Sequence, residues 1–298
     1  MSKLSAWLQA SRLPSQTYIF FPLLLGAGLF HWRSGLPIQP GHLLLAQLYG
    51  LFLQLYIVYA NDYADAPSDG ANTTYTPFSG GSRVIPQGKL SLGALRNAAL
   101  LMAAANLLLG LGLFFWARRP LALPLILVSL LLLWMYSFPP FKLSYRGGGE
   151  LLQVLGVGVV LPLMGYSMQA GDWGGFPWTW MLFLLPMNIA AAFTTTIPDT
   201  PSDKTSGKKT VSVLLGAGVV QKLVVGFYAV GLAGFIAFSG LPAARTLKIS
   251  ALPFVCWILL LPFSCNAAPG TRNCLLFVTL AVAVQVLWTA TTAIYLLF

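Results

Sequence analysis

The amino-acid sequence predicts an all-α polytopic membrane protein, a bundle of nine transmembrane helices with a polar cap on the cytoplasmic side. Two observations lead to this fold class. The 298 residues are 57% hydrophobic and only 8% charged, whereas soluble domains carry roughly 25% charged residues. The apolar runs are long and show no alternation of apolar and polar residues, which favours membrane-spanning helices over a β-barrel.

Nine apolar runs are interpreted as spans, because a bilayer core of about 30 Å takes roughly 20 helical residues. A short interfacial helix in Ser5–Arg12 is expected before them, capped by Ser5 and with Trp7 and Leu8 facing lipid. The residues Ala117–Pro120 (ARRP) form a tight link between the third and fourth spans. The expected spans are Thr17–Trp32, His42–Asn61, Leu95–Trp116, Leu121–Tyr136, Leu151–Met168, Trp178–Thr195, Val219–Phe238, Leu247–Phe263 and Cys274–Phe298.

The basic residues are divided unequally between the two sides of such a bundle. Nine spans place the termini on opposite sides, and twelve of the 17 Lys and Arg residues then share the side of the N-terminus. Positively charged loops stay cytoplasmic, so we expect an integral protein of a prokaryotic inner membrane with its N-terminus inside. This topology and anionic headgroups account for the net charge of +10. No basic soluble module suggests nucleic acid as a partner.

Six of the seven acidic residues fall on this same side, in the loops after the second, fourth and sixth spans. Four of them occupy two near-identical pentapeptides, DAPSD at Asp65–Asp69 and DTPSD at Asp199–Asp203. Acidic residues of transporters usually lie near the bilayer midplane. Their position at span ends here argues against transport and places the polar chemistry at the membrane rim.

The acidic residues form two sets, and the spacing within each set is that of residues on one face of a helix. Asp62, Asp65 and Asp69 share one helix face at i, i+3, i+7, although Pro67 is expected to kink or end that helix. Asp199 and Asp203 follow at i, i+4. Crowded carboxylates repel each other and call for a cation, and Mg²⁺ uses one or two carboxylates while phosphate oxygens complete its shell. The pattern predicts two or more Mg²⁺ ions that clamp a diphosphate; the alternative is a pair of solvated loop ends.

Basic and aromatic residues occupy the same three loops. Arg binds phosphate with two hydrogen bonds and Lys acts as a point charge, so these residues would offset the charge of a diphosphate. The alternative is that membrane topology alone, through the positive-inside rule, accounts for some of these basic residues. Gly80–Gly81 forms either an anion-binding nest or a flexible turn. Aromatic rings suit a carbocation intermediate, or else form an interfacial belt. The candidates are Arg83, Lys89, Lys142, Arg146, Lys204, Lys208, Lys209, Tyr136 and Tyr145.

These motifs resemble the UbiA superfamily of intramembrane prenyltransferases. The most specific are N-D-x-x-D-x-x-x-D at Asn61–Asp69 and D-x-x-x-D followed by G-K-K-T at Asp199–Thr210. The stretches FSGGSRVIPQGKLS and YSFPPFKLSYRGGGE look closest to the MenA-like branch, which attaches a polyprenyl chain to 1,4-dihydroxy-2-naphthoate on the way to menaquinone. The resemblance covers essentially the whole chain and implies one UbiA-like domain, residues 1–298.

The resemblance implies Mg²⁺-dependent transfer of a polyprenyl group from an allylic diphosphate to a small aromatic acceptor. Asp62, Asp65 and Asp69 would bind one ion, and Asp199 and Asp203 a second; Asp62, Asp65, Asp199, Asp203 and Lys142 would be the catalytic residues. The diphosphate would be bound by Asn61, Arg83, Lys89, Lys142, Arg146, Lys204 and Lys208, and the ring or cation by Tyr136 and Tyr145. Two alternatives stay open: a UbiA-type terpene cyclase that needs no acceptor, and a prenyltransferase with another aromatic acceptor.

Overall fold

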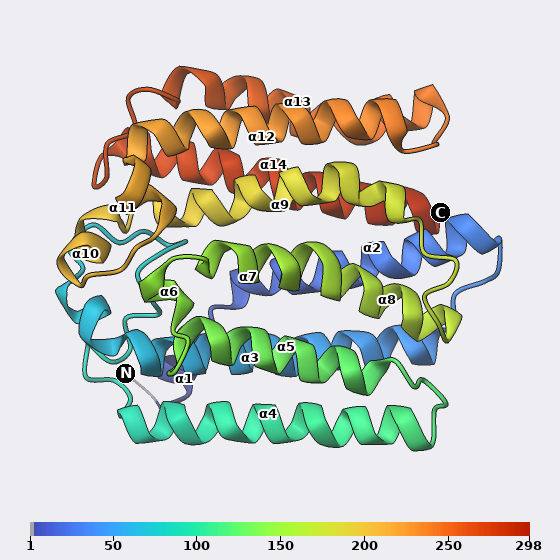
Figure 1. The fold of residues 1–298 in the computed structure, drawn as a ribbon, viewed down its shortest axis with the longest axis horizontal. Coiled ribbons are helices and arrows are strands. Elements are labelled where there is room, and N and C mark those ends of the chain that lie inside the picture. The colour runs from blue at the N-terminus through green and yellow to red at the C-terminus, as the bar shows by residue number, and fades with distance from the viewer. Residues whose placement is uncertain (1–2) are drawn as a thin grey trace.

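The computed structural model describes residues 3–298, and within this range the chain forms helices and no β-strand. The long helices run side by side, and the start of α1 and the end of α14 lie at opposite ends of the bundle (Figure 1). The elements are α1 (Lys3–Ala10), η1 (Leu13–Gln16), α2 (Thr17–Ser34), α3 (Pro40–Ala71), α4 (Leu92–Phe115), α5 (Ala122–Ser137), α6 (Leu143–Arg146), α7 (Gly149–Leu155), η2 (Gly156–Val160), α8 (Leu161–Ala170), η3 (Trp178–Trp180), α9 (Met181–Thr196), α10 (Thr200–Thr205), α11 (Val211–Leu215), α12 (Ala217–Phe238), α13 (Ala243–Leu260), η4 (Leu261–Phe263) and α14 (Arg272–Leu297).

Eight helical segments within residues 3–298 are long and apolar enough to cross a membrane. Their outward faces stay apolar; on α4, for example, Leu100, Leu108 and Trp116 are exposed, and hydrocarbon tails would cover such a surface more favourably than water. The chain is an integral membrane protein. The predicted fourth span, α5, is apolar but has only 16 residues, so the count of nine spans stays a prediction.

The helix α3 continues past the predicted end of the second span and reaches Ala71. Pro67 does not end it, because a proline this close to the C-terminus removes only one backbone hydrogen bond of the last turns. Those turns are closed by the Ser68 hydroxyl, which donates to the Asp65 carbonyl (2.9 Å), and by the Asn72 N–H, which donates to the Asp69 carbonyl (3.2 Å). All three aspartates of the first motif therefore lie on one helix.

The N-terminal helix α1 confirms the helix expected before the first span, with two corrections. Ser5 lies inside α1 and does not cap it. Trp7 does not face lipid: its ring packs edge-on against Tyr59 of α3, with 5.5 Å between centroids. Leu8 is exposed as expected. The ring contact anchors α1 on α3, close to the first aspartate motif.

The interior is held by close helix crossings and aromatic packing. A Cβ atom at Gly26 of α2 would collide with the Pro162 carbonyl of α8, and one at Gly165 would collide with the Leu23 carbonyl. Small residues permit such close approach between membrane helices. Beside this crossing, edge-to-face rings join η3, α9, α12 and α14: Trp180, Phe183, Phe235 and Trp288.

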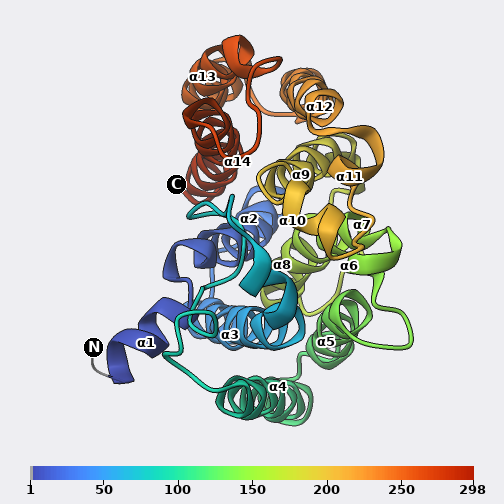
Figure 2. The same ribbon diagram turned by 90° about the vertical axis from the view of Figure 1, so that its left-hand side faces the viewer.

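The segments that follow α3, α5 and α9 meet at one end of the bundle (Figure 1, left). Figure 2 faces this end, where the end of α3 and α10 lie near the centre and α4 and α13 at opposite edges. Hydrogen bonds join the segments: the Thr74 hydroxyl donates to the Pro198 carbonyl (2.9 Å), and the Lys209 N–H donates to the Tyr145 carbonyl (3.2 Å). The two aspartate motifs are thereby brought together.

Candidate active site

A cavity of about 660 Å³ opens between the helices at this end of the bundle. Its polar part is lined by charged residues of both motifs and of their neighbouring loops, namely Arg12, Asp65, Asp69, Arg83, Asp199, Asp203 and Lys208. Its apolar part is lined by side chains of α2, α3, α5, α7, η2, α8 and α14. One cavity therefore joins an ionic region to a hydrocarbon region.

The first motif presents its carboxylates from one face of α3. Asp65 and Asp69 line the cavity, and the Asn61 side-chain amide donates to Asp65 Oδ2 (3.1 Å). Asp62 is 3% exposed and is not among the cavity-lining residues. Its carboxylate is paired with the Arg12 guanidinium and accepts a hydrogen bond from the Ser82 hydroxyl. Asp62 thus differs from the other two aspartates in lying outside the cavity lining, with protein donors on both of its oxygens.

The second motif begins just before the short helix α10 and continues into its first turn. Asp199 precedes the helix and accepts hydrogen bonds from the Asn72 side-chain amide (2.8 Å) and the Gly80 N–H (3.0 Å). Burial raises the pKa of Asp199, and these hydrogen bonds oppose the increase. The Gly80 N–H, expected to belong to an anion-binding nest or a flexible turn, therefore binds a carboxylate of the protein itself. The loop after α3 is fastened onto the second motif through Asp199.

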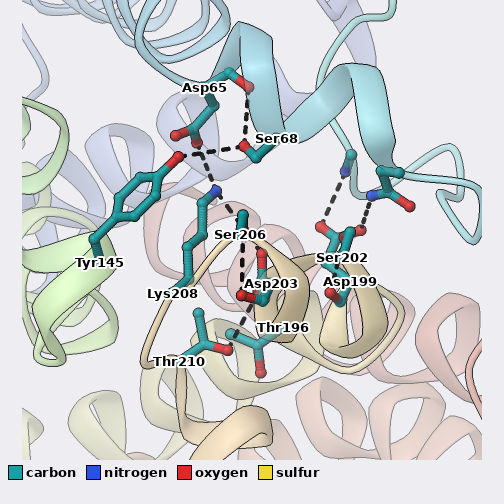
Figure 3. A network of polar contacts seen from close by, with 12 residues as sticks. Asp65, Ser68, Tyr145, Thr196, Asp199, Ser202, Asp203, Ser206, Lys208 and Thr210 are labelled. Carbon is teal, nitrogen blue, oxygen red and sulfur yellow. Dashed lines mark hydrogen bonds and ion pairs between the residues drawn. The ribbon is translucent and has the colours of Figure 1, made fainter.

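Lys208 lies between the two motifs (Figure 3). Its Nζ is 3.0 Å from Asp65 Oδ2 and 3.8 Å from Asp203 Oδ1. Burial alone would lower the pKa of Lys208, but the two carboxylates outweigh burial and hold it above its usual value. Burial raises the pKa of Asp203 to about 7, although Lys208 and the Thr210 hydroxyl, which donates to Asp203 Oδ2 (3.2 Å), oppose the increase. A single buried ammonium group bridges carboxylates from two helices.

The sequence profile of the UbiA prenyltransferase family matches residues 19–290, most of the chain. The chain belongs to the UbiA prenyltransferase family. It is a membrane prenyltransferase, which confirms the resemblance found in the two aspartate motifs.

Two curated relatives share similar identity with this prenyltransferase. The 1,4-dihydroxy-2-naphthoate octaprenyltransferase of Bacillus subtilis is 27% identical over 225 residues, 74% of this chain and 69% of that protein. The digeranylgeranylglyceryl phosphate synthase of Korarchaeum cryptofilum is 24% identical over 216 residues, 72% of this chain and 69% of that protein. The two names describe different products, so the relatives do not select one acceptor.

Solved structures share the fold of this prenyltransferase. A UbiA homologue from Archaeoglobus fulgidus, solved with DMAPP and Mg²⁺, has a TM-score of 0.71 at 14% identity and covers 97% of this chain and 98% of its own. A homologue from Aeropyrum pernix K1 has a TM-score of 0.67 at 18% identity and covers 90% and 94%. The likeness in shape over nearly the whole chain supports the all-α membrane fold that the sequence predicts.

Only some of the predicted basic residues reach the cavity of this prenyltransferase. Arg83 lines it, contacts the Asp69 carbonyl through its guanidinium and stacks on the Tyr75 ring at 4.4 Å. Lys208 lines it as described. Lys89 instead donates to the Gln9 side chain (2.6 Å). Arg146 and Lys204 are exposed and do not line the cavity.

The predicted catalytic residue Lys142 also lies outside the cavity lining. It borders a separate surface hollow beside Tyr63 and Phe138, and its ammonium group sits 3.7 Å from the centre of the Tyr145 ring. Tyr145 is not a lining residue either; its hydroxyl is 3.4 Å from Ser68 Oγ. Tyr136 does line the cavity. A direct role of Lys142 in the chemistry therefore has no support in this geometry.

Several residues of the site carried no role in the sequence-based prediction. Arg12 lines the cavity and pairs with Asp62; a lone arginine just before the first span was its only signal. Asn72 and Ser82 bind aspartates of the two motifs through loop geometry that no spacing rule reveals. Thr210 closes the G-K-K-T motif and binds Asp203. These residues position the carboxylates.

The donor set of the cavity fits Mg²⁺. Four carboxylates and three cationic side chains line it, so a diphosphate would add negative charge to a site that already has an excess of it. Among residues 3–298 no three acidic, histidine or cysteine side chains are close enough to hold an ion by themselves. Mg²⁺ needs only one or two carboxylates per ion, with phosphate and water as its remaining ligands. Lys208 occupies the position between the motifs as a cation of the protein itself.

Proposed function

We propose that this protein transfers a polyprenyl group from an allylic diphosphate to 1,4-dihydroxy-2-naphthoate, in an Mg²⁺-dependent step of menaquinone biosynthesis. The observation that carries the proposal is the single cavity that joins carboxylates of both motifs to an apolar region. An allylic diphosphate has the same two halves, one ionic and one hydrocarbon. We propose that the polar end faces the cytoplasm of a prokaryotic inner membrane.

Asp65 and Asp69 on α3, with Asp199 just before α10 and Asp203 within it, are the residues that would hold two Mg²⁺ ions. When bound, the ions would act as Lewis acids that withdraw charge from the diphosphate. We assign Asp62 to the support of this site, because Arg12 and Ser82 occupy its oxygens.

Different side chains of the cavity would stabilise the two charges that form when the substrate ionises. Cleavage of the allylic C–O bond leaves negative charge on the diphosphate and positive charge on the prenyl carbon. Lys208 and Arg83 stabilise the leaving diphosphate, since both line the cavity beside the carboxylates. The Tyr136 ring offers its face to the allylic cation. The apolar region holds the hydrocarbon chain and excludes water, which would otherwise capture the cation.

The acceptor is assigned from two supporting observations. The loops around Arg83 and Lys142 resemble the MenA-like branch, and the Bacillus subtilis relative is named for 1,4-dihydroxy-2-naphthoate. The archaeal relative supports a second candidate, a prenylated glyceryl phosphate acceptor. An electron-rich ring attacks an allylic cation through carbon, whereas a glyceryl phosphate would attack through its free hydroxyl. Products of the two reactions differ in mass and in the bond formed.

The test is product analysis with the purified protein in lipid nanodiscs. With Mg²⁺, geranylgeranyl diphosphate and 1,4-dihydroxy-2-naphthoate we expect diphosphate release and a prenylated naphthoate. Asp65→Ala and Asp199→Ala should each reduce turnover by about 10²-fold or more, as expected for loss of charge stabilisation in a dry site. Asp172→Ala is the matched control, because Asp172 is exposed and lies outside the cavity lining.

Three outcomes would contradict the proposal. Transfer to geranylgeranylglyceryl phosphate and not to the naphthoate would select the second acceptor. A cyclic terpene formed without any acceptor would make the protein a cyclase. Full turnover in both Asp65→Ala and Asp199→Ala would exclude the metal clamp.

A further inference from the structure

The apolar part of the cavity runs between α5 and the helix that starts at Gly149. From α5 it is lined by Ser129, Leu132, Leu133 and Tyr136, which share one helix face by their spacing. Tyr136 marks the polar end of this stripe, because it lies in the last turn of α5, at the end of the bundle where the two aspartate motifs meet. Leu132 lies one turn deeper, about 6 Å along the helix axis at 1.5 Å per residue.

The adjoining wall contains a glycine directly beside Leu132. Gly156 lines the cavity, and a Cβ atom built on it would meet only Leu132 Cδ1, at 3.8 Å. Gly156 also begins the π-helical turn η2, in which the Leu161 N–H donates to the Gly156 carbonyl five residues earlier. Single π turns inside α-helices are frequent at functional sites. A side chain longer than that of alanine at position 156 would extend beside Leu132 into the cavity that both residues line.

Neither packing nor backbone geometry explains the glycine at this position. Gly158, two residues later, has a packing reason, because a Cβ there would press against Asn188 at 3.1–3.2 Å. Gly156 has no such neighbour. Its backbone angles, φ −60° and ψ −59°, are ordinary helical values that any residue adopts. Glycine inside a helix costs about 1 kcal/mol relative to alanine, and its effect here is to keep this point of the cavity wall free of a side chain.

We infer that Gly156 is a specificity-determining residue that sets how long a prenyl chain the enzyme accepts. The inference rests on the proposed use of allylic diphosphates. With the diphosphate at the carboxylates, the hydrocarbon chain passes Tyr136 and then runs along the part of the cavity wall that Gly156 and Leu132 form together. The missing side chain leaves the cavity wide along this part of its wall, and short chains end before they reach it.

The test compares Gly156→Ala and Gly156→Leu with the native protein, using dimethylallyl, geranyl and geranylgeranyl diphosphates. In Gly156→Leu the kcat/KM for geranylgeranyl diphosphate should fall by about tenfold or more, as expected when an apolar pocket excludes part of a substrate. The kcat/KM for dimethylallyl diphosphate should change much less. Gly156→Ala should show the same trend more weakly, since its added Cβ makes only an ordinary contact with Leu132.

A binding measurement and a matched control accompany the kinetics. Affinities for unreactive thiolodiphosphates of the same three lengths should follow the same order without any turnover. Gly226→Leu is the control, because Gly226 lies on an exposed face of α12 with open space around its Cα; it should leave the length profile unchanged.

The outcomes separate the inference from the proposed function. If the native protein binds and transfers prenyl groups, and Gly156→Leu weakens all three lengths equally or none, the length-setting role is wrong while the proposed function stands. If no prenyl diphosphate binds the native protein, both fail. Selective loss of the longest diphosphate in Gly156→Leu, with an intact profile in Gly226→Leu, supports the inference.

Discussion

The ammonium group of Lys208 and the carboxylate of Asp65, which lie 143 positions apart in the chain, are 3.0 Å from each other in the interior of the protein. This contact joins the loop after α10 to the face of α3. Asp203 lies on the other side of the same ammonium group at 3.8 Å. The two aspartate motifs are thus held together by a positive charge even before any substrate is considered.

The first prediction concerns Lys208→Met. The side chain of Lys208 is only 10% exposed, and removing one partner of a buried ion pair typically costs about 3–5 kcal/mol of folding free energy. We expect a lower midpoint of thermal unfolding in the presence of EDTA, and partial recovery with Mg²⁺, because the ions would again offset the repulsion between Asp65 and Asp203. Lys209→Met is the control, since its side chain is exposed. Equal thermal stability of Lys208→Met and Lys209→Met in EDTA would contradict the prediction.

The second prediction concerns the hydrogen bond from Asn72 to Asp199. Loss of a residue that orients a metal-binding carboxylate commonly costs about 10–100-fold in metal affinity. In Asn72→Ala we expect the Mg²⁺ concentration for half-maximal turnover to rise by such a factor, with a smaller change in turnover at saturating Mg²⁺. Asn97→Ala, an exposed position on α4, provides the comparison. A reduced maximum at unchanged Mg²⁺ dependence would mean that Asn72 acts in another way.

Much of the fold and part of the site could be predicted from the sequence, and the exceptions have identifiable causes. The long apolar runs predict the bundle because lipid leaves the backbone few other choices. The spacing of Asp65, Asp69, Asp199 and Asp203 brings these residues to one cavity because each set shares a helix face or a helix end. The spacing of residues within one helix is a local property, so the sequence is enough to predict it.

The sequence did not decide which of the predicted basic residues between the long helices reach the cavity. Lys89 belongs to the same loop as Arg83, and Lys204 to the same segment as Lys208, but sequence proximity does not say which side chain turns inward. Only the structure shows that Lys89 reaches Gln9 and that Lys142 lies over Tyr145. Partners supplied from distant segments, such as Arg12 for Asp62, leave no spacing signal in the chain.

The third prediction tests whether Asp62 acts through Arg12. If Asp62 supports the site by holding the guanidinium, then removing either partner disturbs the same arrangement. We expect the double variant Arg12→Ala/Asp62→Asn to lose little more turnover than the more damaging single variant, with a coupling of about 0.5–3 kcal/mol in a double-mutant cycle. Additive losses would instead show that Asp62 serves the reaction independently, as a direct metal ligand would.

The fourth prediction uses two glycines of the loop after α3. Gly81 and Gly88 both have positive φ, 74° and 64°, so alanine at either position pays a similar backbone strain of about 1–2 kcal/mol. They differ in their surroundings: a Cβ at Gly81 would collide with the Asp69 carboxylate, whereas nothing lies within 4 Å of one at Gly88. Gly81→Ala should therefore displace Asp69 and lower turnover by about tenfold or more, in keeping with the sensitivity of reactions to small misplacements.

Gly88→Ala should lower thermal stability by the cost of this backbone strain, while its turnover stays near that of the native protein. The two variants together separate strain in the loop from displacement of the carboxylate. The measurement is turnover at saturating prenyl diphosphate alongside the midpoint of thermal unfolding. If Gly81→Ala and Gly88→Ala reduce turnover equally, the loop matters only through its stability. If Gly81→Ala alone loses turnover, the close approach of the Gly81 backbone holds Asp69 in place for the reaction.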